Sequence, residues 1–288
     1  MALKGRQPED IKRGKAKFIL SGKSGVGKSF FMLDFPRPVI IDCEGGSVEP
    51  QYTKKMKEVG AWYIGKEDGS QDFKTVIDQF KELATTKHEY QTLVIDSFSK
   101  LYNLTAAIAE ETVGNVYAAD KKAAQKPTRQ LQLWMDRLDM TIALVCHSKP
   151  KWESGQPTGT TTFDGWDKLE YDLNLWVELV QTGKRRDVVV RKSRIEGFIL
   201  GNSYPADYET FAKLYGSDVM AKAPEQMTLA TADQIAEAMG LMTTFNVSLE
   251  DQKKALKKYD VDEWQELSTA EIGKIIDGLK SKLTKGAK

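Results

Sequence analysis

Short apolar runs alternate with amphipathic stretches over the first two thirds of the chain. The runs KFIL, VIID, WYI, TLVID and TIALVC are typical of buried strands, whereas residues 72–84, the segment after Ser97 and residues 128–139 carry helical patterns. Strands that alternate with helices predict an α/β fold with a mostly parallel central sheet covered on both faces. Two later runs, LNLWVELV and DVVV, flank Gly183 and predict a β-hairpin.

Two long polar segments interrupt this pattern. They are residues 114–126 (GNVYAADKKAAQK) and residues 151–166 (KWESGQPTGTTTFDGW), and each follows an apolar helix or strand. Long polar segments in a compact domain are usually binding or mobile loops. We therefore expect both to be functional loops.

The sequence pattern changes after Ala221. Capping-box patterns open three helical stretches, at Thr231 with Gln234, Ser248 with Asp251, and Ser268 with Glu271. The last stretch places Ile272, Ile275, Ile276, Leu279 and Leu283 on one face. These patterns predict a basic lead-in at residues 1–16, a core at 17–221, a linker at 222–226 and a small C-terminal helical module at 227–288.

Composition and charge narrow the class of protein. With 41% apolar and 29% charged residues the chain is globular, and 42 basic against 41 acidic residues leave a formal charge of +1. Any affinity for nucleic acid must then come from local patches. Two cysteines and two histidines give neither a disulfide framework nor a zinc site. No apolar run approaches the roughly 18 residues of a membrane span, so we expect a cytoplasmic protein without membrane contact.

The segment GKSGVGKS directly follows the strand run KFIL and precedes a helical stretch. It fits the phosphate-binding pattern G-x-x-x-x-G-K-[ST], in which backbone N–H groups surround the phosphates of a nucleotide. Lys28 would reach the β- and γ-phosphates and Ser29 would bind Mg²⁺. The sequence therefore predicts ATP and Mg²⁺ as cofactors, and the ATP-binding residues are Gly22, Lys23, Ser24, Gly25, Val26, Gly27, Lys28, Ser29 and Phe30.

Two strand runs end in an aspartate that could hold the metal, at Asp42 and Asp96. We favour Asp96, acting on Mg²⁺ through water, because Glu44 beside Asp42 suits a different task. That task is activation of the attacking water, since Ser97 occupies the place after Asp96 and is not basic. The alternative is that Glu44 is a solvated loop residue.

These segments resemble the RecA family over about residues 16–198. VIIDCEGGSVEP is similar to the strand followed by the catalytic glutamate, and TLVIDSFSKL is similar to the Walker B strand. TIALVCHSKP resembles the nucleotide-sensing strand, with His147 in the place of glutamine. DVVVRKSRIEGF resembles the strand whose two cations reach the neighbouring subunit's ATP. The resemblance implies a RecA-like P-loop NTPase core, a homo-oligomer in ring or filament form, and catalytic roles for Lys28, Glu44, His147, Lys192 and Arg194.

The resemblance also implies a DNA partner. The two polar segments fall where RecA-like proteins carry DNA-binding loops, and their DNA-binding candidates are Lys121, Lys122, Lys126, Trp152, Phe163 and Trp166. Exposed aromatic side chains can stack on bases and lysines can neutralise the backbone. Lys184, Arg185 and Arg186 form a basic hairpin tip, for which a solvated turn is the simplest interpretation and a phosphate contact is the alternative.

A compact core with a short lead-in and a helical tail is similar to phage-encoded RecA-like ATPases, which act with single-stranded DNA and its binding protein. The resemblance implies an ATP-hydrolysing recombination or annealing protein, in the cytoplasm of a bacterial host. Two other classes stay open. A P-loop kinase of a nucleotide or small metabolite would need an arginine-rich lid, for which the sequence gives no convincing candidate. The sequence does not distinguish an ATP-dependent switch or loader for a replication or recombination partner from a recombination or annealing ATPase.

Overall fold

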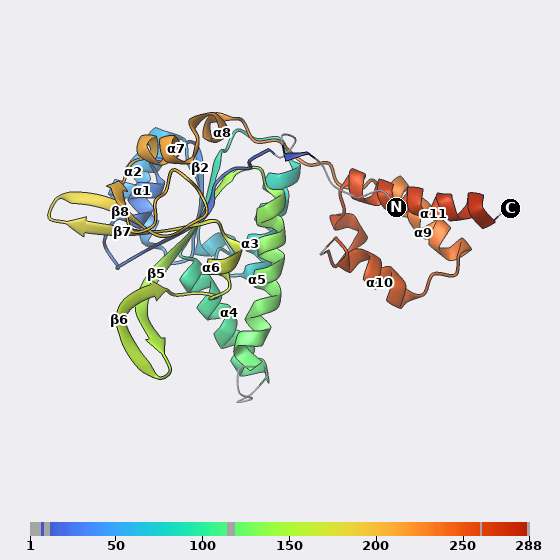
Figure 1. The fold of residues 1–288 in the computed structure, drawn as a ribbon, viewed down its shortest axis with the longest axis horizontal. Coiled ribbons are helices and arrows are strands. Elements are labelled where there is room, and N and C mark those ends of the chain that lie inside the picture. Colours follow the sequence, from blue (N-terminus) through green and yellow to red (C-terminus); the bar gives the residue numbers. More distant parts are fainter. Residues whose placement is uncertain (1–6, 9–11, 114–118, 260, 287–288) are drawn as a thin grey trace. The chain divides into compact units, whose positions relative to one another are not determined.

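The computed structural model of the chain describes residues 7–8, 12–113, 119–259 and 261–286 (Figure 1). The chain divides into two compact units. The first consists of residues 1–79, 88–128 and 139–224, and the second of residues 80–87, 129–138 and 225–288. The second unit therefore combines the C-terminal part of the chain with two short segments from its middle.

The first unit is built on one sheet in the order β3-β2-β4-β5-β1-β7-β8-β9. The strands are β1 (Lys17–Gly22), β2 (Pro38–Asp42), β3 (Trp62–Ile64), β4 (Thr92–Asp96), β5 (Thr141–Glu153), β6 (Gln156–Phe163), β7 (Leu175–Thr182), β8 (Arg185–Ser193) and β9 (Ser203–Pro205). Pairing is parallel from β3 to β7, whereas β8 and β9 add antiparallel strands at one edge. The predicted α/β fold with a mostly parallel sheet is confirmed.

Helices follow the predicted order along the chain. They are α1 (Lys28–Met32), α2 (Pro50–Val59), α3 (Phe73–Thr85), α4 (Phe98–Val113), α5 (Ala119–Arg137), α6 (Leu169–Asp172), α7 (Tyr208–Tyr215), α8 (Ser217–Ala221), α9 (Ala232–Thr244), α10 (Leu249–Lys257) and α11 (Thr269–Gly286). In one buried cluster Phe31 of α1 and Phe211 of α7 pack with Phe18, Leu179 and Val188 from the sheet. This packing fixes α1, and with it the loop that precedes α1, against β1, β7 and β8.

The polar segments differ from the predicted loops. Residues 151–163 form most of the β5–β6 hairpin, which projects beyond the sheet in Figure 1. β-Branched threonines at 158 and 160–162 favour extended backbone, which explains why this polar stretch forms a strand. Residues 119–126 belong to α5, because alanine and lysine favour a helix. The remainder of the first segment, residues 114–118, lies outside the described residues.

The end of the basic lead-in packs against the core. Lys15 is only 5% exposed, and its Nζ donates to the carbonyl oxygens of Val219 (2.7 Å) and Met220 (3.1 Å). The guanidinium of Arg13 lies 3.9 Å from the centroid of the Tyr215 ring. These basic residues therefore contact α7 and α8, Lys15 from a buried position and Arg13 from an exposed one.

The second unit has a core of its own. Ala238, Leu256, Leu267, Ile272 and Ile276 are buried together, and Leu133 of α5 packs against them. The predicted caps are present, since the hydroxyls of Thr231, Ser248 and Ser268 accept from the backbone N–H groups three residues later. None of the helices in the described ranges is long and apolar enough to span a membrane.

Segments of α3 and α5 bind the C-terminal helices through polar contacts within the second unit. Arg137 pairs with Glu271 at 3.2 Å, and Lys81 pairs with Glu266 at 2.9 Å. The N–H of Met227 donates to the carbonyl of Ala84 at 2.8 Å. The helical module predicted at residues 227–288 therefore shares its core and polar contacts with residues 80–87 and 129–138.

Candidate active site

The loop between β1 and α1 closes around the side chain of Lys28. Gly25 and Gly27 have φ values of 75° and 99°, which glycine adopts without strain. A Cβ on Gly22 would lie 2.8 Å from the carbonyl oxygen of Leu179, so the close approach of β7 requires glycine. Lys28 Nζ donates to the carbonyl oxygens of Gly22 (2.9 Å) and Lys23 (3.0 Å). The loop thus has the curvature and the buried cation that a phosphate cradle requires.

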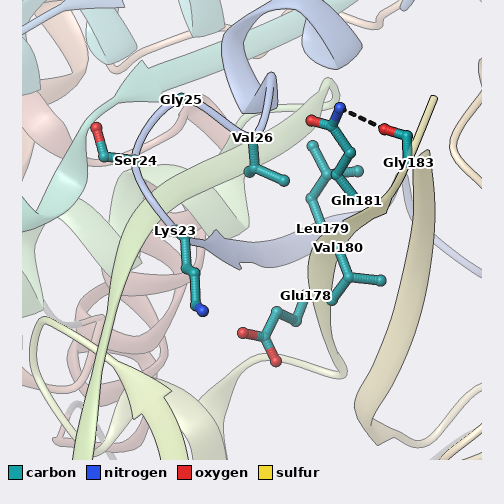
Figure 2. A pocket seen from close by; sticks show the side chains of 9 residues that line it. All are labelled: Lys23, Ser24, Gly25, Val26, Glu178, Leu179, Val180, Gln181 and Gly183. Carbon is teal, nitrogen blue, oxygen red and sulfur yellow. Dashed lines mark hydrogen bonds between the residues drawn. The ribbon is translucent and has the colours of Figure 1, made fainter. Parts of the chain in front are cut away.

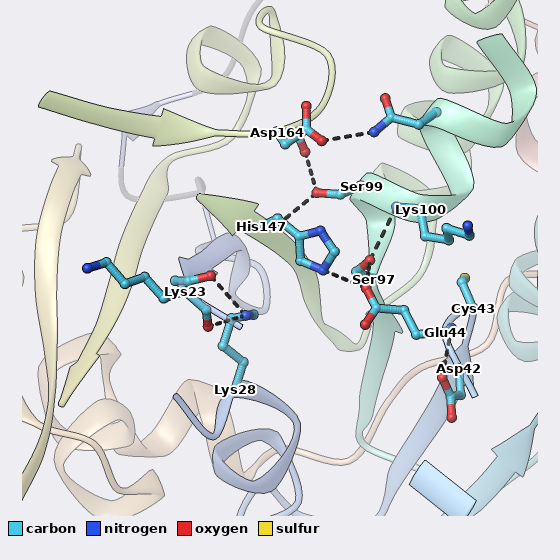
Figure 3. Close-up of polar contacts among 12 residues, drawn as sticks. Lys23, Lys28, Asp42, Cys43, Glu44, Ser97, Ser99, Lys100, His147 and Asp164 are labelled. Carbon is cyan, nitrogen blue, oxygen red and sulfur yellow. Dashed lines mark hydrogen bonds and ion pairs between the residues drawn. The ribbon is translucent and has the colours of Figure 1, made fainter. Parts of the chain in front are cut away.

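The strand order brings the other predicted residues to the same edge of the sheet. β5 lies between β1 and β4, so His147 is directly opposite Gly22. β4 lies beside β2, and Asp96 is opposite Asp42. Because the carboxyl ends of parallel strands meet at one edge, Lys28, Asp96, Glu44 and His147 gather around one space, as Figure 3 shows for Lys28, Glu44 and His147. Sequence reasoning predicted this set.

Asp96 lies beside Ser29, and its carboxylate accepts a hydrogen bond from the Ser29 hydroxyl. Burial raises the pKa of Asp96 to about 6, and the nearby Glu44 and Asp42 charges add to this, whereas Ser29 and Lys28 oppose it. A carboxylate and a hydroxyl are hard oxygen donors, which suit Mg²⁺. In the described part of the chain no group of three or more His, Cys, Asp or Glu side chains could hold a metal. Two protein ligands suffice for Mg²⁺ when phosphates and water complete its coordination, so the residues fit this ion.

Glu44 lies just past the end of β2 and is held by two side chains. Its Oε1 accepts a short hydrogen bond from the hydroxyl of Ser97 and lies 2.6 Å from Nε2 of His147 (Figure 3). Its side chain is 40% exposed, so a water molecule can reach the carboxylate. Glu44 therefore has a defined orientation, in contact with Ser97 just beyond β4 and with His147 of β5.

The carboxylate of Asp42 holds the backbone of the loop that carries Glu44. It is 1% exposed, and its carboxylate accepts from the N–H groups of Glu44 (3.0 Å), Gly45 (2.7 Å) and Ser47 (2.9 Å). The hydroxyl of Tyr63 lies 3.3 Å from the same carboxylate, and burial together with Asp42 raises the pKa of Tyr63 to about 12. The oxygens of Asp42 are occupied in orienting this loop, which leaves Asp96 as the better candidate for the metal.

Asp42→Ala should destabilise the protein by about 3 kcal/mol, because each buried donor that loses its partner costs about 1–3 kcal/mol. The free energy of unfolding in urea would measure this change. Asp78→Ala is a matched control, since Asp78 forms an exposed pair with Lys74 in α3, and such pairs contribute less than about 1 kcal/mol. Equal unfolding free energies for the two variants would show that Asp42 does not hold the loop.

The base of the β5–β6 hairpin is fastened to α4. The N–H of His147 donates to Oγ of Ser99 at 2.9 Å, and this hydroxyl donates to the carbonyl of Asp164. The carboxylate of Asp164 accepts from Asn103 at 2.8 Å and Lys149 at 3.1 Å. The hairpin therefore begins directly after His147, the residue that contacts Glu44, and its base is tied to the helix that follows Asp96.

The aromatic DNA candidates differ in exposure. Trp152 on the hairpin is 62% exposed, whereas Phe163 is 1% and Trp166 7% exposed. The premise that all three are exposed is therefore corrected: the ring of Phe163 packs edge-on against Trp176, with 5.2 Å between centroids, and Trp166 is also buried. Lys126 is exposed on α5. Lys121 and Lys122 lie on the same helix, but their side chains are outside the described set.

The two cations predicted to act on a neighbouring subunit lie at the end of β8 and just beyond it. Lys192 Nζ donates to the carbonyl of Leu173 at 2.6 Å, and burial together with Arg194 lowers the pKa of Lys192. Arg194 is exposed. Phe30, predicted to bind the nucleotide, is half-buried and packs edge-on against Tyr52, with 5.8 Å between centroids.

A cavity of about 470 Å³ adjoins the phosphate loop. It is lined by residues 23–26 of the loop and by residues 178–181 and Gly183 of the β7–β8 hairpin (Figure 2). The carboxylate of Glu178 is not free within it, because Arg191 pairs with this carboxylate at 2.6 Å. The cavity therefore offers the loop backbone, an apolar wall at Val26 and Leu179, and the amide of Gln181.

Sequence reasoning did not find Ser97, Ser99, Asp164 or the loop-orienting role of Asp42. The sequence shows that Ser97 is not a base, but it does not show that the Ser97 hydroxyl orients the glutamate. Asp42 was recognised as a strand-end carboxylate, but its three N–H partners appear only once the loop is folded. Asp164 joins residues 103 and 149, which no local pattern connects.

The fold and the site together define a P-loop nucleotide-binding protein. A family model described as an AAA domain matches residues 14–185, and the chain belongs to this family. This membership supports an ATPase. No curated protein matches the chain. Among solved structures the chain is similar to the "Crystal structure of the RadB recombinase", with 14% identity and a TM-score of 0.44, over 66% of this chain and 86% of that chain.

Proposed function

We propose that the protein hydrolyses ATP and couples hydrolysis to binding of single-stranded DNA, as a phage-encoded recombination or annealing ATPase. One observation carries the proposal: Glu44, next to the phosphate loop, contacts His147, and His147 begins the segment that continues into the exposed β5–β6 hairpin. The family match supports the ATPase, and the contact supports its coupling to a ligand on the hairpin.

The chemical step is assigned to residues at the edge of the sheet. Lys28 and the loop N–H groups bind the phosphates, and Ser29 with Asp96 would hold Mg²⁺, which when bound offsets phosphate charge. Glu44 takes a proton from the attacking water, whose oxygen bonds to the γ-phosphorus while the bond from this phosphorus to the β–γ bridging oxygen breaks and ADP leaves with the electron pair. Ser97 and His147 orient the carboxylate for this transfer.

DNA is proposed to bind on the hairpin through Trp152, with Lys126 and the neighbouring lysines of α5 as phosphate contacts. Trp152 is exposed, and base stacking on aromatic rings is tolerant of sequence. A ligand that displaces the hairpin would act on His147, and through it on Glu44. We extend the proposal to a homo-oligomer, ring or filament, in which Lys192 and Arg194 reach the next subunit's ATP, and to a single-strand DNA-binding protein as a further partner.

ATP turnover with and without a single-stranded oligonucleotide tests the proposal. We expect stimulation in the wild type, and Trp152→Ala should need about tenfold more DNA for half-maximal stimulation, since one stacked base contributes roughly 1–3 kcal/mol. Trp62→Ala is the matched control, because Trp62 is 56% exposed at the amino end of β3, whereas the hairpin continues from the carboxyl end of β5. An ATP turnover rate that does not change when DNA is added would favour the ATP-dependent switch or loader. Phosphate transfer to an added nucleoside would favour the P-loop kinase.

A further inference from the structure

The tip of the β7–β8 hairpin carries three consecutive cations, and they are not equivalent. Arg185 Nε pairs with Oδ1 of the buried Asp187 at 2.8 Å. Arg186 has no such partner: within the described residues its side chain forms no ion pair and no hydrogen bond. Its backbone is nevertheless fixed, since its carbonyl accepts from the N–H of Ala206 at 3.1 Å. An anchored strand thus presents an unpaired guanidinium.

Strand alternation directs this guanidinium toward the phosphate loop. Arg186 is opposite Gln181, as Val188 is opposite Leu179, so these four residues share one face of the hairpin. Val188 and Leu179 belong to the buried cluster that includes Val26 of the loop. The same face therefore covers the loop, and Gln181 lines the cavity beside it.

The guanidinium lies directly against Gly27. A Cβ added to Gly27 would lie 2.9 Å from Nε of Arg186 and 3.1 Å from its Cζ. Gly27 precedes Lys28, whose ammonium is buried and hydrogen-bonded only to carbonyl oxygens of the loop among its described contacts. Two cations thus flank the same turn, and Arg186 contributes a charge that no carboxylate in the described structure compensates.

We propose that Arg186 binds a phosphate group of the nucleotide held by its own subunit. A planar guanidinium offers paired donors that match phosphate oxygens, and bound phosphate would compensate the otherwise unpaired charge. This inference rests on the proposed function, because it assumes that the loop binds a nucleoside triphosphate. It makes the β7–β8 hairpin part of the nucleotide site, with a cation in cis that is separate from the proposed trans pair Lys192 and Arg194.

Titration of mant-ATP and mant-ADP fluorescence against purified variants tests the proposal. Arg186→Ala should lower the affinity for both nucleotides by about 10- to 100-fold, because a hydrogen bond to a charged group contributes about 1.5–3 kcal/mol. Arg186→Lys should recover part of the loss, since it keeps the charge without the fork. Lys184→Ala removes one positive charge from the same tip, and we expect affinity within about twofold of the wild type.

Competition by inorganic tripolyphosphate tests whether Arg186 contacts the phosphates of the nucleotide rather than its base or ribose. Tripolyphosphate should displace mant-ATP from the wild type, and its own affinity should fall in Arg186→Ala by a similar factor. Unchanged nucleotide affinity in Arg186→Ala would overturn the inference, as would an equal loss in Lys184→Ala. A loss of oligonucleotide affinity alone would assign Arg186 to DNA and also overturn it. If the wild type bound no nucleotide, or if Lys28→Ala left nucleotide binding unchanged, the proposed function would be wrong. The inference about Arg186 would then be wrong as well.

Discussion

Lys28→Ala is expected to lower ATP turnover by at least about 100-fold and to weaken nucleotide binding, because loss of the ammonium leaves phosphate charge uncompensated. Burial lowers the pKa of Lys28, while Asp96 and Glu44 raise it. Its hydrogen bonds to the carbonyl oxygens of Gly22 and Lys23 hold the side chain at the loop. Steady-state phosphate release and mant-ATP titration would measure the two effects.

The same substitution removes two hydrogen bonds that close the loop. Thermal unfolding without nucleotide separates this structural loss from the loss of phosphate binding. Lys54→Ala is the charge-matched control, since Lys54 is exposed on α2, and it should keep wild-type turnover. Wild-type turnover by Lys28→Ala would contradict the assignment of residues 22–29 to the phosphates.

Glu44→Gln is expected to keep ATP binding while slowing hydrolysis by roughly 100- to 10,000-fold, the range that a general base contributes. The amide oxygen of glutamine can still accept from Ser97, so the loop should keep its conformation. It cannot take a proton from water. Single-turnover hydrolysis alongside nucleotide affinity would show a loss confined to the chemical step.

Glu49→Gln provides the control for Glu44→Gln, because Glu49 is exposed at the end of the same loop. It loses the same charge and should hydrolyse ATP normally. If the Glu44 variant also turned over at the wild-type rate, Glu44 would be an ordinary loop residue, and the attacking water would be activated by another group.

The sequence predicted the parts of the site that depend on local pattern. The apolar runs before Gly22, Asp42 and Asp96 are buried strands, and their parallel pairing carries the three polar ends to one edge of the sheet. A strand followed by a glycine-rich loop is a local pattern, so it can be recognised in the sequence without knowing the rest of the fold.

What the sequence did not show depends on contacts between distant segments. The threonine-rich stretch at residues 156–163 looked like a loop, because its polar composition outweighed its β-branched residues, and pairing with β5 decided its structure. Arg186 looked like a solvated turn residue, because its nearness to Gly27 exists only after the hairpin packs on the loop. The C-terminal helices looked independent, yet Leu133 packs into their core.

The position of β1 in the sheet has a consequence for the order in which the protein folds. β1 pairs with β5 and β7, and Lys17 meets Ile142 while Phe18 meets Leu175. Both partners are synthesised more than a hundred residues after β1. Closing such long loops before the contacts form is entropically slow. During synthesis the segment KFILSG therefore lacks both strand partners until β5 and β7 have been made, and the phosphate loop that follows it cannot pack against Leu179 of β7 before then.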